Sequence, residues 1–317
     1  MAWWKVSAFI GFVTAALLRQ YVRYCRKCPS KANMSGKTVI ITGANSGLGK
    51  AAAFELARRK AKIILACRSL PSAKDTAKQI QASTGNIEVW PKELDLASLE
   101  SIRNFCFQIL SEEPKIDVLI NNAGVFQCPY MRTEDGFEMQ MGVNHFGHFL
   151  LTSLLLERIK ASSPSRIVIV SSALSKRGSI NFSDIHSQLF YDKVKAYSDS
   201  KLANLLFARG LHERLKGSGV EVFPLHPGMV ATNLGRHIVS GFVARVFGPI
   251  AVMLGLRDAD EGCQSIVYCA VAEELKGKSG TYIGKNCKES GYPPNALDEM
   301  AVKKLWEISE KLTKVQS

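Results

Sequence analysis

A buried strand that leads directly into a glycine turn and a helix constrains this chain more than any other feature. Thr38–Thr42 is β-branched, apolar and uncharged, which predicts a short strand buried on both faces. Gly43, Gly47 and Gly49 follow at once, and a helix is expected from about Lys50 to Arg59. The glycines allow a pyrophosphate to approach the backbone, and the helix N-terminus offers free N–H groups. The segment predicts a nucleotide site; a glycine turn that binds nothing is the alternative.

The rest of the chain continues this pattern. Alternating strand-like and helix-like segments run from Lys37 to beyond Val222 without a Pro/Gly/Ser-rich linker. Further buried strands are expected at Ile63–Cys67, Asp117–Asn121, Ile167–Val170 and Val220–Leu225. A chain of 317 residues with this alternation predicts one α/β domain, a Rossmann-type doubly wound parallel sheet.

Tyr197 and Lys201 are four residues apart in AYSDSK, so they lie on one face of a helix. A phenol titrates near ~10 and exchanges protons poorly at neutral pH. We expect the lysine ammonium to lower that pKa and to make Tyr197 a proton donor or acceptor. The pair is common by itself and gains weight from the nucleotide motif upstream.

The formal charge of +13 restricts the partners of the chain. Lysines and arginines are dispersed, and no basic helix carries interleaved aromatic residues, so nucleic acid is not an expected partner. A phosphorylated cofactor and an anionic membrane surface explain the charge more simply.

The eight cysteines are typical of a reducing compartment, because several lie in apolar strand or helix contexts. Cys25 and Cys28 form a single C-x-x-C with no matching pair downstream, so no metal site is expected. Both could carry palmitate beside a membrane, and two unmodified thiols are the alternative.

The N-terminus predicts a membrane anchor. The thirteen residues from Val6 to Leu18 carry no charge and are flanked by Trp3, Trp4, Tyr21 and Tyr24. A spanning helix needs about 17–25 residues, so this segment reaches only the lower edge. A cleaved signal peptide is the main alternative, but basic residues follow the segment where a cleavage site would be needed. That positive flank predicts that the rest of the chain faces the cytosol. The expected location is the endoplasmic reticulum membrane, with a mitochondrial membrane or a lipid droplet as the alternative.

A second apolar stretch, Phe242 to Leu256, contains only Arg245 as a charge. It predicts either an apolar lid over a lipid substrate or an ordinary core helix.

Taken together, TGANSGLG, NNAG, Asn144, Ser172 and YSDSK resemble the short-chain dehydrogenase/reductase family from about Gly36 to the C-terminus. The segments NHFGHFLLTSLLL, HPGMVATNLGRH and DEMAVKKLWEISEK resemble its membrane-bound, NADP-preferring retinol dehydrogenases. This resemblance implies three regions: an anchor at 1–24, a basic juxtamembrane linker at 25–36 and a catalytic domain at 37–317.

The resemblance also implies the site. Catalysis would rest on Tyr197, Lys201, Ser172 and Asn144, with Ser172 holding the substrate oxygen and Asn144 holding a water that supplies protons. The cofactor NADP(H) would be bound by Gly43, Asn45, Ser46, Gly47, Leu48, Gly49, Arg68, Asp95, Leu96, Asn121, Ala123, Gly124, Tyr197, Lys201, Pro227, Gly228 and Thr232. His226 is interpreted as structural, and the insert at roughly 176–195 as part of a substrate entrance.

The residue at the end of the second strand predicts the form of the cofactor. An acidic residue there binds a ribose 2′-hydroxyl, whereas a basic one accommodates a 2′-phosphate. This chain has Cys67 followed by Arg68, whose planar guanidinium suits phosphate, so NADP(H) is favoured over NAD(H). An Arg68 that only meets solvent is the alternative.

The resemblance predicts an oxidoreductase that interconverts retinal and retinol, with reduction favoured. Reduction of other lipophilic aldehydes or steroids is the first alternative. A pigment reductase and a catalytically silent, nucleotide-binding membrane scaffold are further alternatives, although the intact set of four catalytic residues argues against the scaffold. A homo-oligomer is compatible with the family.

Overall fold

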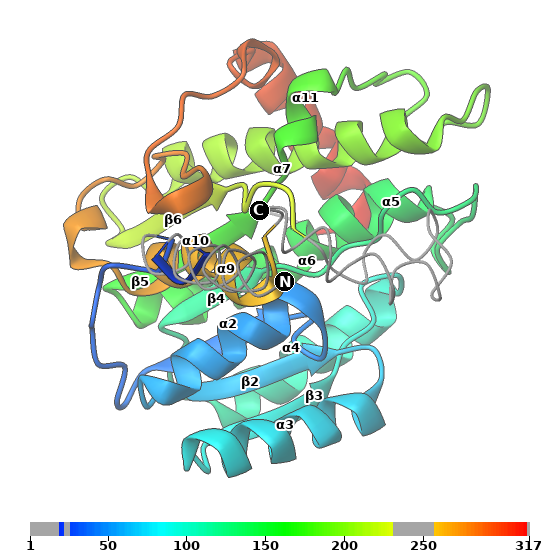
Figure 1. The fold of residues 1–317 in the computed structure, drawn as a ribbon. Coiled ribbons are helices and arrows are strands. Elements are labelled where there is room, and N and C mark those ends of the chain that lie inside the picture. The colour runs from blue at the N-terminus through cyan, green and yellow to red at the C-terminus, as the bar shows by residue number, and fades with distance from the viewer. Residues whose placement is uncertain (1–18, 22–25, 231–256, 316–317) are drawn as a thin grey trace, which may run out of the picture.

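Six parallel strands form one sheet in the order β3-β2-β1-β4-β5-β6 (Figure 1). The computed structural model describes residues 19–21, 26–230 and 257–315. The strands are β1 (Thr38–Thr42), β2 (Lys62–Cys67), β3 (Val89–Glu93), β4 (Val118–Asn121), β5 (Ser165–Val170) and β6 (Val220–Leu225). The single doubly wound parallel sheet predicted from the sequence is therefore confirmed.

The central strand is apolar because helices cover both of its faces. Every residue of β1 is buried. Val39 and Ile41 pack into the hydrophobic cluster on one side of the sheet, whereas Ile40 packs into the cluster on the other. Successive side chains of a strand point to opposite faces, so an uninterrupted apolar run is what a two-sided environment requires.

Two helical layers enclose the sheet. On one side lie α2 (Gly47–Arg58), α3 (Leu70–Thr84), α9 (Ala259–Gly262) and α10 (Gln264–Val271). On the other side lie α4 (Leu99–Glu112), α6 (Gly147–Ala161) and α7 (Lys193–Arg214), with α11 (Glu299–Thr313) packed outside α7 (Figure 1). The remaining helical turns are short: α5 (Met139–Met141), η1 (Gly142–Phe146), η2 (Ala173–Arg177), η4 (Glu273–Leu275), η5 (Lys285–Cys287) and η6 (Pro294–Ala296).

The order of the strands creates the place for a ligand. After β1 the chain builds β2 and β3 to one side, and then returns to place β4 on the other side of β1. The loops that leave β1 and β4 therefore run in opposite directions and leave a crevice at the carboxyl ends of these strands. The first helix begins at Gly47 rather than near Lys50, because the glycine turn continues directly into it from an extended Ser46.

The segment before the sheet packs on the catalytic domain. Arg19 and Arg26 both pair with the carboxylate of Glu261 in α9, at 2.7 and 3.3 Å. The backbone N–H of Met34 donates to the carbonyl of Arg59 at 2.7 Å. Gly262, next to Glu261, lies close to Leu48 and Val230, since a Cβ added to it would meet each of them at 2.7 Å.

Some expectations fall outside the described residues. They concern most of the anchor at 1–24, the apolar stretch from 242 to 256, Cys25 and Thr232. Within the part of the chain that the structure describes, no helix is both long and apolar enough to cross a membrane.

Candidate active site

A cavity of about 340 Å³ lies over the carboxyl ends of the strands. It brings together most residues predicted to bind the cofactor or to catalyse, although they come from seven segments of the chain. Those that line it are Gly43, Asn45, Ser46, Gly47, Leu48, Arg68, Asp95, Leu96, Ala123, Gly124, Ser172, Tyr197, Lys201, Pro227 and Gly228.

The glycine turn is compact for steric reasons. Gly43 has a φ of +66°, and a Cβ on it would approach Ala123 to 3.0 Å. A Cβ on Gly49 would meet the Asn122 side-chain nitrogen and the Gly43 carbonyl oxygen, each at 2.5 Å. Gly43 therefore gives the turn its left-handed residue. Gly49 does not line the cavity; it lets α2 approach the end of β4.

The start of α2 suits an anionic group. Ser46 precedes the helix in an extended conformation, and its side chain makes no capping hydrogen bond. The first turn carries no acidic residue. Backbone N–H groups at such a helix end, together with the helix dipole, favour a pyrophosphate. The cradle formed by this turn therefore fits a dinucleotide.

The end of β2 offers a cation to the same cavity. Arg68 is exposed and lines the cavity beside Asn45 and Ser46. Within the described residues its guanidinium forms no hydrogen bond or ion pair, so its donors are available to a ligand. Asp95 lies just after the neighbouring strand β3, and its carboxylate accepts the Ala97 N–H at 2.9 Å.

Tyr197 and Lys201 lie on one face of α7 as predicted, and both are almost fully buried. The Lys201 Nζ lies 5.8 Å from the centre of the Tyr197 ring. Ser172, which follows β5, is within hydrogen-bonding reach of the Tyr197 hydroxyl. Phe126 packs edge-on against the Tyr197 ring with centroids 4.4 Å apart, which fixes the plane of the ring.

Backbone contacts hold this part of α7 against β5. The Lys201 ammonium donates to the Val170 carbonyl at 3.0 Å, and the Ser171 hydroxyl donates to the Lys201 carbonyl at 2.7 Å. The side chain of Asn204 donates to the same Val170 carbonyl at 3.2 Å. The face of α7 that carries Tyr197 and Lys201 is thus attached to the strand end that precedes Ser172.

Asn144 lies in the π-helical turn η1, directly before α6. Its side-chain oxygen accepts the Val125 N–H at 2.8 Å, and its nitrogen donates to the Val125 carbonyl and to Ser200. A Cβ added to Gly124 would lie 3.1 Å from the Asn144 oxygen and 3.6 Å from the Lys201 Nζ. Asn144 therefore sits behind Gly124 and beside the lysine, rather than on the cavity wall.

The electrostatics differ from the sequence expectation. Burial raises the pKa of Tyr197 to about 12, and the Ser172 hydroxyl opposes this shift. Burial also lowers the pKa of Lys201 to about 8. The expected lowering of the Tyr197 pKa by Lys201 is not found. Both groups are buried, and burial raises the pKa of a phenol, which the spacing of the two residues in the sequence does not reveal.

Asn121 also requires a correction. Its side chain points away from the cavity and donates to the Thr152 hydroxyl of α6 at 2.8 Å. Asn122 lines the cavity instead, and its side chain donates to the Thr42 carbonyl at 2.8 Å. The alternating direction of strand side chains predicts this orientation. Leu119 and Asn121 are two residues apart in β4, so both face the same helical layer.

Several lining residues were not predicted: most are apolar, and Asn122 and Ser171 adjoin the predicted residues of the same motifs. They are Ala66, Ser69, Leu94, Asn122, Val125, Val143, Val170, Ser171 and Val230. His226 is not among the lining residues; its ring packs against Tyr282 with centroids 5.5 Å apart, in keeping with the structural interpretation.

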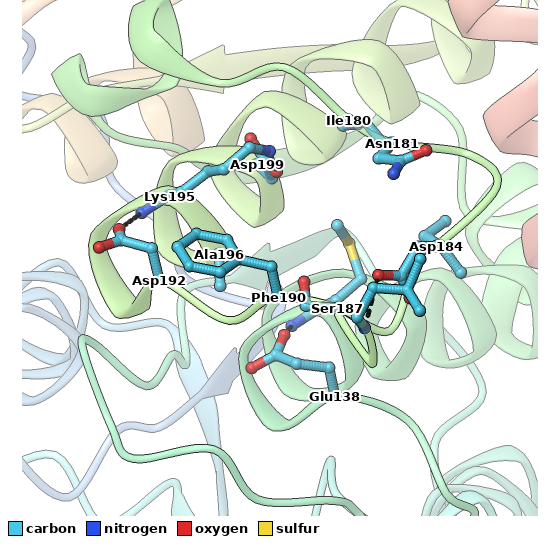
Figure 2. Close-up of a pocket in the computed structure, with 13 residues that line it drawn as sticks. Glu138, Ile180, Asn181, Asp184, Ser187, Phe190, Asp192, Lys195, Ala196 and Asp199 are labelled. Atoms are coloured by element: carbon cyan, nitrogen blue, oxygen red, sulfur yellow. Dashed lines mark hydrogen bonds and ion pairs between the residues drawn. The ribbon is translucent and has the colours of Figure 1, made fainter.

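The insert after η2 forms a second cavity of about 160 Å³. Figure 2 shows Asp184, Ser187 and Phe190 of the insert around it, together with Glu138 and with Lys195, Ala196 and Asp199 of α7. Neither Tyr197 nor Ser172 lines this cavity. The insert contacts the catalytic side indirectly, because the Tyr191 hydroxyl donates to the Cys128 carbonyl in the loop that also carries Phe126.

The family follows from this arrangement and from comparison with known proteins. The family model described as short chain dehydrogenase matches residues 37–241. The chain belongs to the short-chain dehydrogenase family. It is accordingly an oxidoreductase of the kind that acts on CH–OH groups, as the sequence predicted.

Relatives place it near one branch of that family. Retinol dehydrogenase 14 of Homo sapiens is 52% identical over 290 residues, which cover 87% of this chain and 86% of the relative. Retinol dehydrogenase 13 of Homo sapiens is 49% identical and covers 96% of this chain and 92% of its own length. The resemblance to the retinol dehydrogenases is therefore confirmed.

Solved structures agree with the fold. An uncharacterized protein from Mycobacterium paratuberculosis is 35% identical, with a TM-score of 0.74, and covers 91% of this chain and 97% of its own. A protein described as an NAD(P) dependent gluconate 5-dehydrogenase from Beutenbergia cavernae, with bound NADP, is 25% identical. It has a TM-score of 0.63 and covers 80% of this chain and 96% of its own. A nicotinamide cofactor is therefore supported for the family site.

Replacing Gly49 by alanine should weaken nucleotide binding by at least 10-fold. The new methyl group would have to displace both the Gly43 carbonyl and the Asn122 side-chain amide, which shape the turn. Binding is measured by the fluorescence of NADPH, with circular dichroism as a check of folding. Gly291→Ala is the matched control, because no atom lies within 4 Å of its added Cβ. Equal affinities for the two variants would contradict the steric argument.

The buried Lys201 should make folding stability depend on pH. Its pKa is about 8 in the folded protein, against 10.5 for an unperturbed lysine, so the unfolded chain binds the extra proton between these limits. Lys201 alone therefore contributes a rise in stability of about 2 kcal/mol between pH 7.5 and 9.5. Buried thiols such as Cys67 and Cys106, whose pKa is raised by burial, contribute a fall over the same range. Urea denaturation of wild type and Lys201→Met at the two pH values isolates the lysine, because the change in stability between them should be about 2 kcal/mol less favourable in the variant. Lys78→Met, at an exposed position of α3, should keep the wild-type pH dependence; equal pH dependences of wild type and Lys201→Met would refute the assignment.

Proposed function

We propose that this protein is an NADP(H)-dependent oxidoreductase that interconverts retinal and retinol, with reduction favoured. The main support is that Ser172, Tyr197 and Lys201 line the same cavity as the glycine turn and Arg68. The likeness to retinol dehydrogenases supplies the substrate class.

Ser172 and Tyr197 would hold the substrate oxygen. Their hydroxyl groups are within hydrogen-bonding reach of each other at the carboxyl end of β5, where one carbonyl oxygen can contact both. A phenol with a pKa of about 12 is fully protonated at neutral pH, which suits donation of a proton to a nascent alkoxide. NADPH, when bound, supplies the hydride.

Lys201 and Asn144 would support this proton transfer. The Lys201 ammonium is held at the Val170 carbonyl, close enough to Gly124 to meet a ribose that enters the cavity. Asn144 is fixed beside it by Val125 and Ser200, in the position from which it would hold a water for proton resupply.

Arg68 would select the phosphorylated cofactor. It is the exposed basic side chain at the end of β2, and its predecessor Cys67 offers no carboxylate to a ribose hydroxyl. The neighbouring Ser69 also lines the cavity and adds a hydroxyl donor.

A membrane site for the enzyme is part of the proposal. The uncharged N-terminal segment and its basic flank favour anchoring, with the domain on the cytosolic side of the endoplasmic reticulum. A mitochondrial membrane or a lipid droplet is the alternative. Such a location would give a lipophilic carbonyl a short path to the cavity.

Tyr197→Phe should abolish retinal reduction while NADPH binding remains. The change removes only the hydroxyl that would donate the proton, so the expected loss of kcat is at least 10²-fold. Purified membranes, NADPH and a panel of retinals, steroids and alkenals are followed by absorbance at 340 nm. Tyr130→Phe is the matched control, because this half-exposed ring packs on Tyr191 and lies outside the cavity.

The outcomes of this assay separate the candidate functions. Turnover of steroids or alkenals but not of retinals would replace the substrate and keep the mechanism. NADPH binding without turnover of any substrate would favour a nucleotide-binding scaffold. Near-normal turnover by Tyr197→Phe would refute the proposed proton donor.

Arg68→Ala should weaken NADPH binding about 10–100-fold and NADH binding by less than about 3-fold. The reason is that a charge-assisted hydrogen bond to the 2′-phosphate contributes about 1.5–3 kcal/mol, and NADH lacks that phosphate. Titration of both cofactors against the same preparation gives the ratio. Arg177→Ala, an exposed arginine outside the cavity, should change neither affinity. Equal losses for NADPH and NADH would defeat the assignment.

A further inference from the structure

Two cysteines that are far apart in the sequence meet on the side of the domain covered by α10. Cys28 belongs to the segment before β1, and Cys287 ends the short turn η5. Both side chains pack against the same hydrophobic cluster, and each thiol shifts the pKa of the other. Both residues also contact Gln264: the Cys28 N–H donates to its side-chain oxygen at 2.9 Å, and the Cys287 thiol donates to its carbonyl at 3.4 Å.

This pair differs from the other described cysteines in accessibility. Cys28 and Cys287 are half-buried, whereas Cys67, Cys106, Cys128, Cys263 and Cys269 are buried. A small reagent can therefore reach this pair, while the others behave as small apolar residues of the core.

The backbone around Cys287 is unusual. Asn286 and Cys287 have φ values of +67° and +57°, in the left-handed region that residues with a side chain rarely adopt. The contacts with Gln264 and Cys28 help to hold Cys287 in this conformation. A conformation of this kind persists only where the surroundings fix it.

The same turn lies next to the part of the cavity wall formed by Gly228 and Val230. Arg257 donates to the Asn286 side chain, and it also pairs through its backbone with Val230, which lines the cavity. A Cβ on Gly228 would approach the Lys285 side chain to 3.4 Å. The position of η5 is therefore linked to the loop that carries Pro227 and Gly228.

The electrostatics of the pair suit thiol chemistry. The neighbouring Cys287 thiol lowers the pKa of the Cys28 thiol, and the charge of Arg59 acts in the same direction. The pKa of Cys287 is raised by Cys28 and by burial. Of the two thiols, Cys28 is thus the more readily deprotonated.

From this geometry we infer that Cys28 and Cys287 form a reversible disulfide, which joins the segment before β1 to η5 beside the active site. The reaction partner is a small disulfide of the oxidised glutathione class. The bond would enclose the whole six-stranded sheet in a covalent loop. Its partial exposure makes it accessible to reduction by glutathione.

The reaction balances as two thiol–disulfide exchanges. The Cys28 thiolate attacks one sulfur of oxidised glutathione, which forms a mixed disulfide on Cys28 and releases one glutathione thiolate. Cys287 then loses its proton to solvent and attacks the Cys28 sulfur, which forms the protein disulfide and releases the second glutathione thiolate. The protein loses two electrons and two protons, and one oxidised glutathione becomes two reduced molecules.

The test uses the full-length protein in reduced/oxidised glutathione buffers of increasing oxidising ratio. Free thiols are then blocked with N-ethylmaleimide, and the protein is digested with trypsin. Trypsin cleaves after Arg26, Lys27, Lys285 and Lys288, so Cys25, Cys28 and Cys287 fall on three different peptides. The expected product joins the peptide of residues 28–31 to that of residues 286–288, and dithiothreitol removes it.

Three variants sharpen the result. Cys287→Ser should abolish the cross-link and leave glutathione on Cys28, and Cys28→Ser should abolish it as well. Cys25→Ser is the matched control and should keep the cross-link. The absence of the cross-link at every ratio, or a link between Cys25 and Cys28 in its place, would overturn the inference. Because the wild-type product is identified by mass, the result does not depend on the folding of any variant or on enzyme activity.

A second measurement follows from the covalent loop. Wild-type protein should show a Tm several degrees higher after oxidation than after reduction, because the bond restricts the unfolded chain. Cys25→Ser should show the same shift, whereas Cys287→Ser should show none. A shift of the same size in Cys287→Ser would assign the stabilisation to another site and contradict the inference.

Discussion

The attachment of α7 to the end of β5 is the interaction on which the site depends. The Lys201 ammonium and the Asn204 amide share the Val170 carbonyl, and Ser171 returns a hydrogen bond to the backbone of Lys201. These bonds are buried, so the loss of either partner would leave a polar group without solvent. They bring Tyr197 of the helix and Ser172 of the strand end together in one cavity. The rest of the sheet then places the glycine turn opposite them.

Much of this arrangement could be predicted from the sequence, for physical reasons that are local. The run Thr38–Thr42 had to be a strand with two covered faces, and the glycines after it had to form a close turn. The spacing of Tyr197 and Lys201 fixed their common helical face. Parallel strands then bring their carboxyl ends together, so residues that follow different strands meet in one crevice.

What could not be predicted depends on contacts between distant segments. The π-helical turn that positions Asn144 has no marker in GVNHFG, and the choice between Asn121 and Asn122 depends on which face of β4 each one leaves. The pKa of Tyr197 depends on burial that only the packed structure provides. The meeting of Cys28 and Cys287 joins the two ends of the chain, and the sequence pairs Cys28 more obviously with Cys25.

The ion pairs of Glu261 give the N-terminal segment a mechanical connection to the active site. Arg19 and Arg26 form ion pairs with Glu261. Its neighbour Gly262 lies close to Leu48 of α2 and to Val230, and both of these residues line the cavity. The segment before β1 and the two walls of the cavity thus meet at one short helix, α9, through the buried Glu261 and its neighbour Gly262.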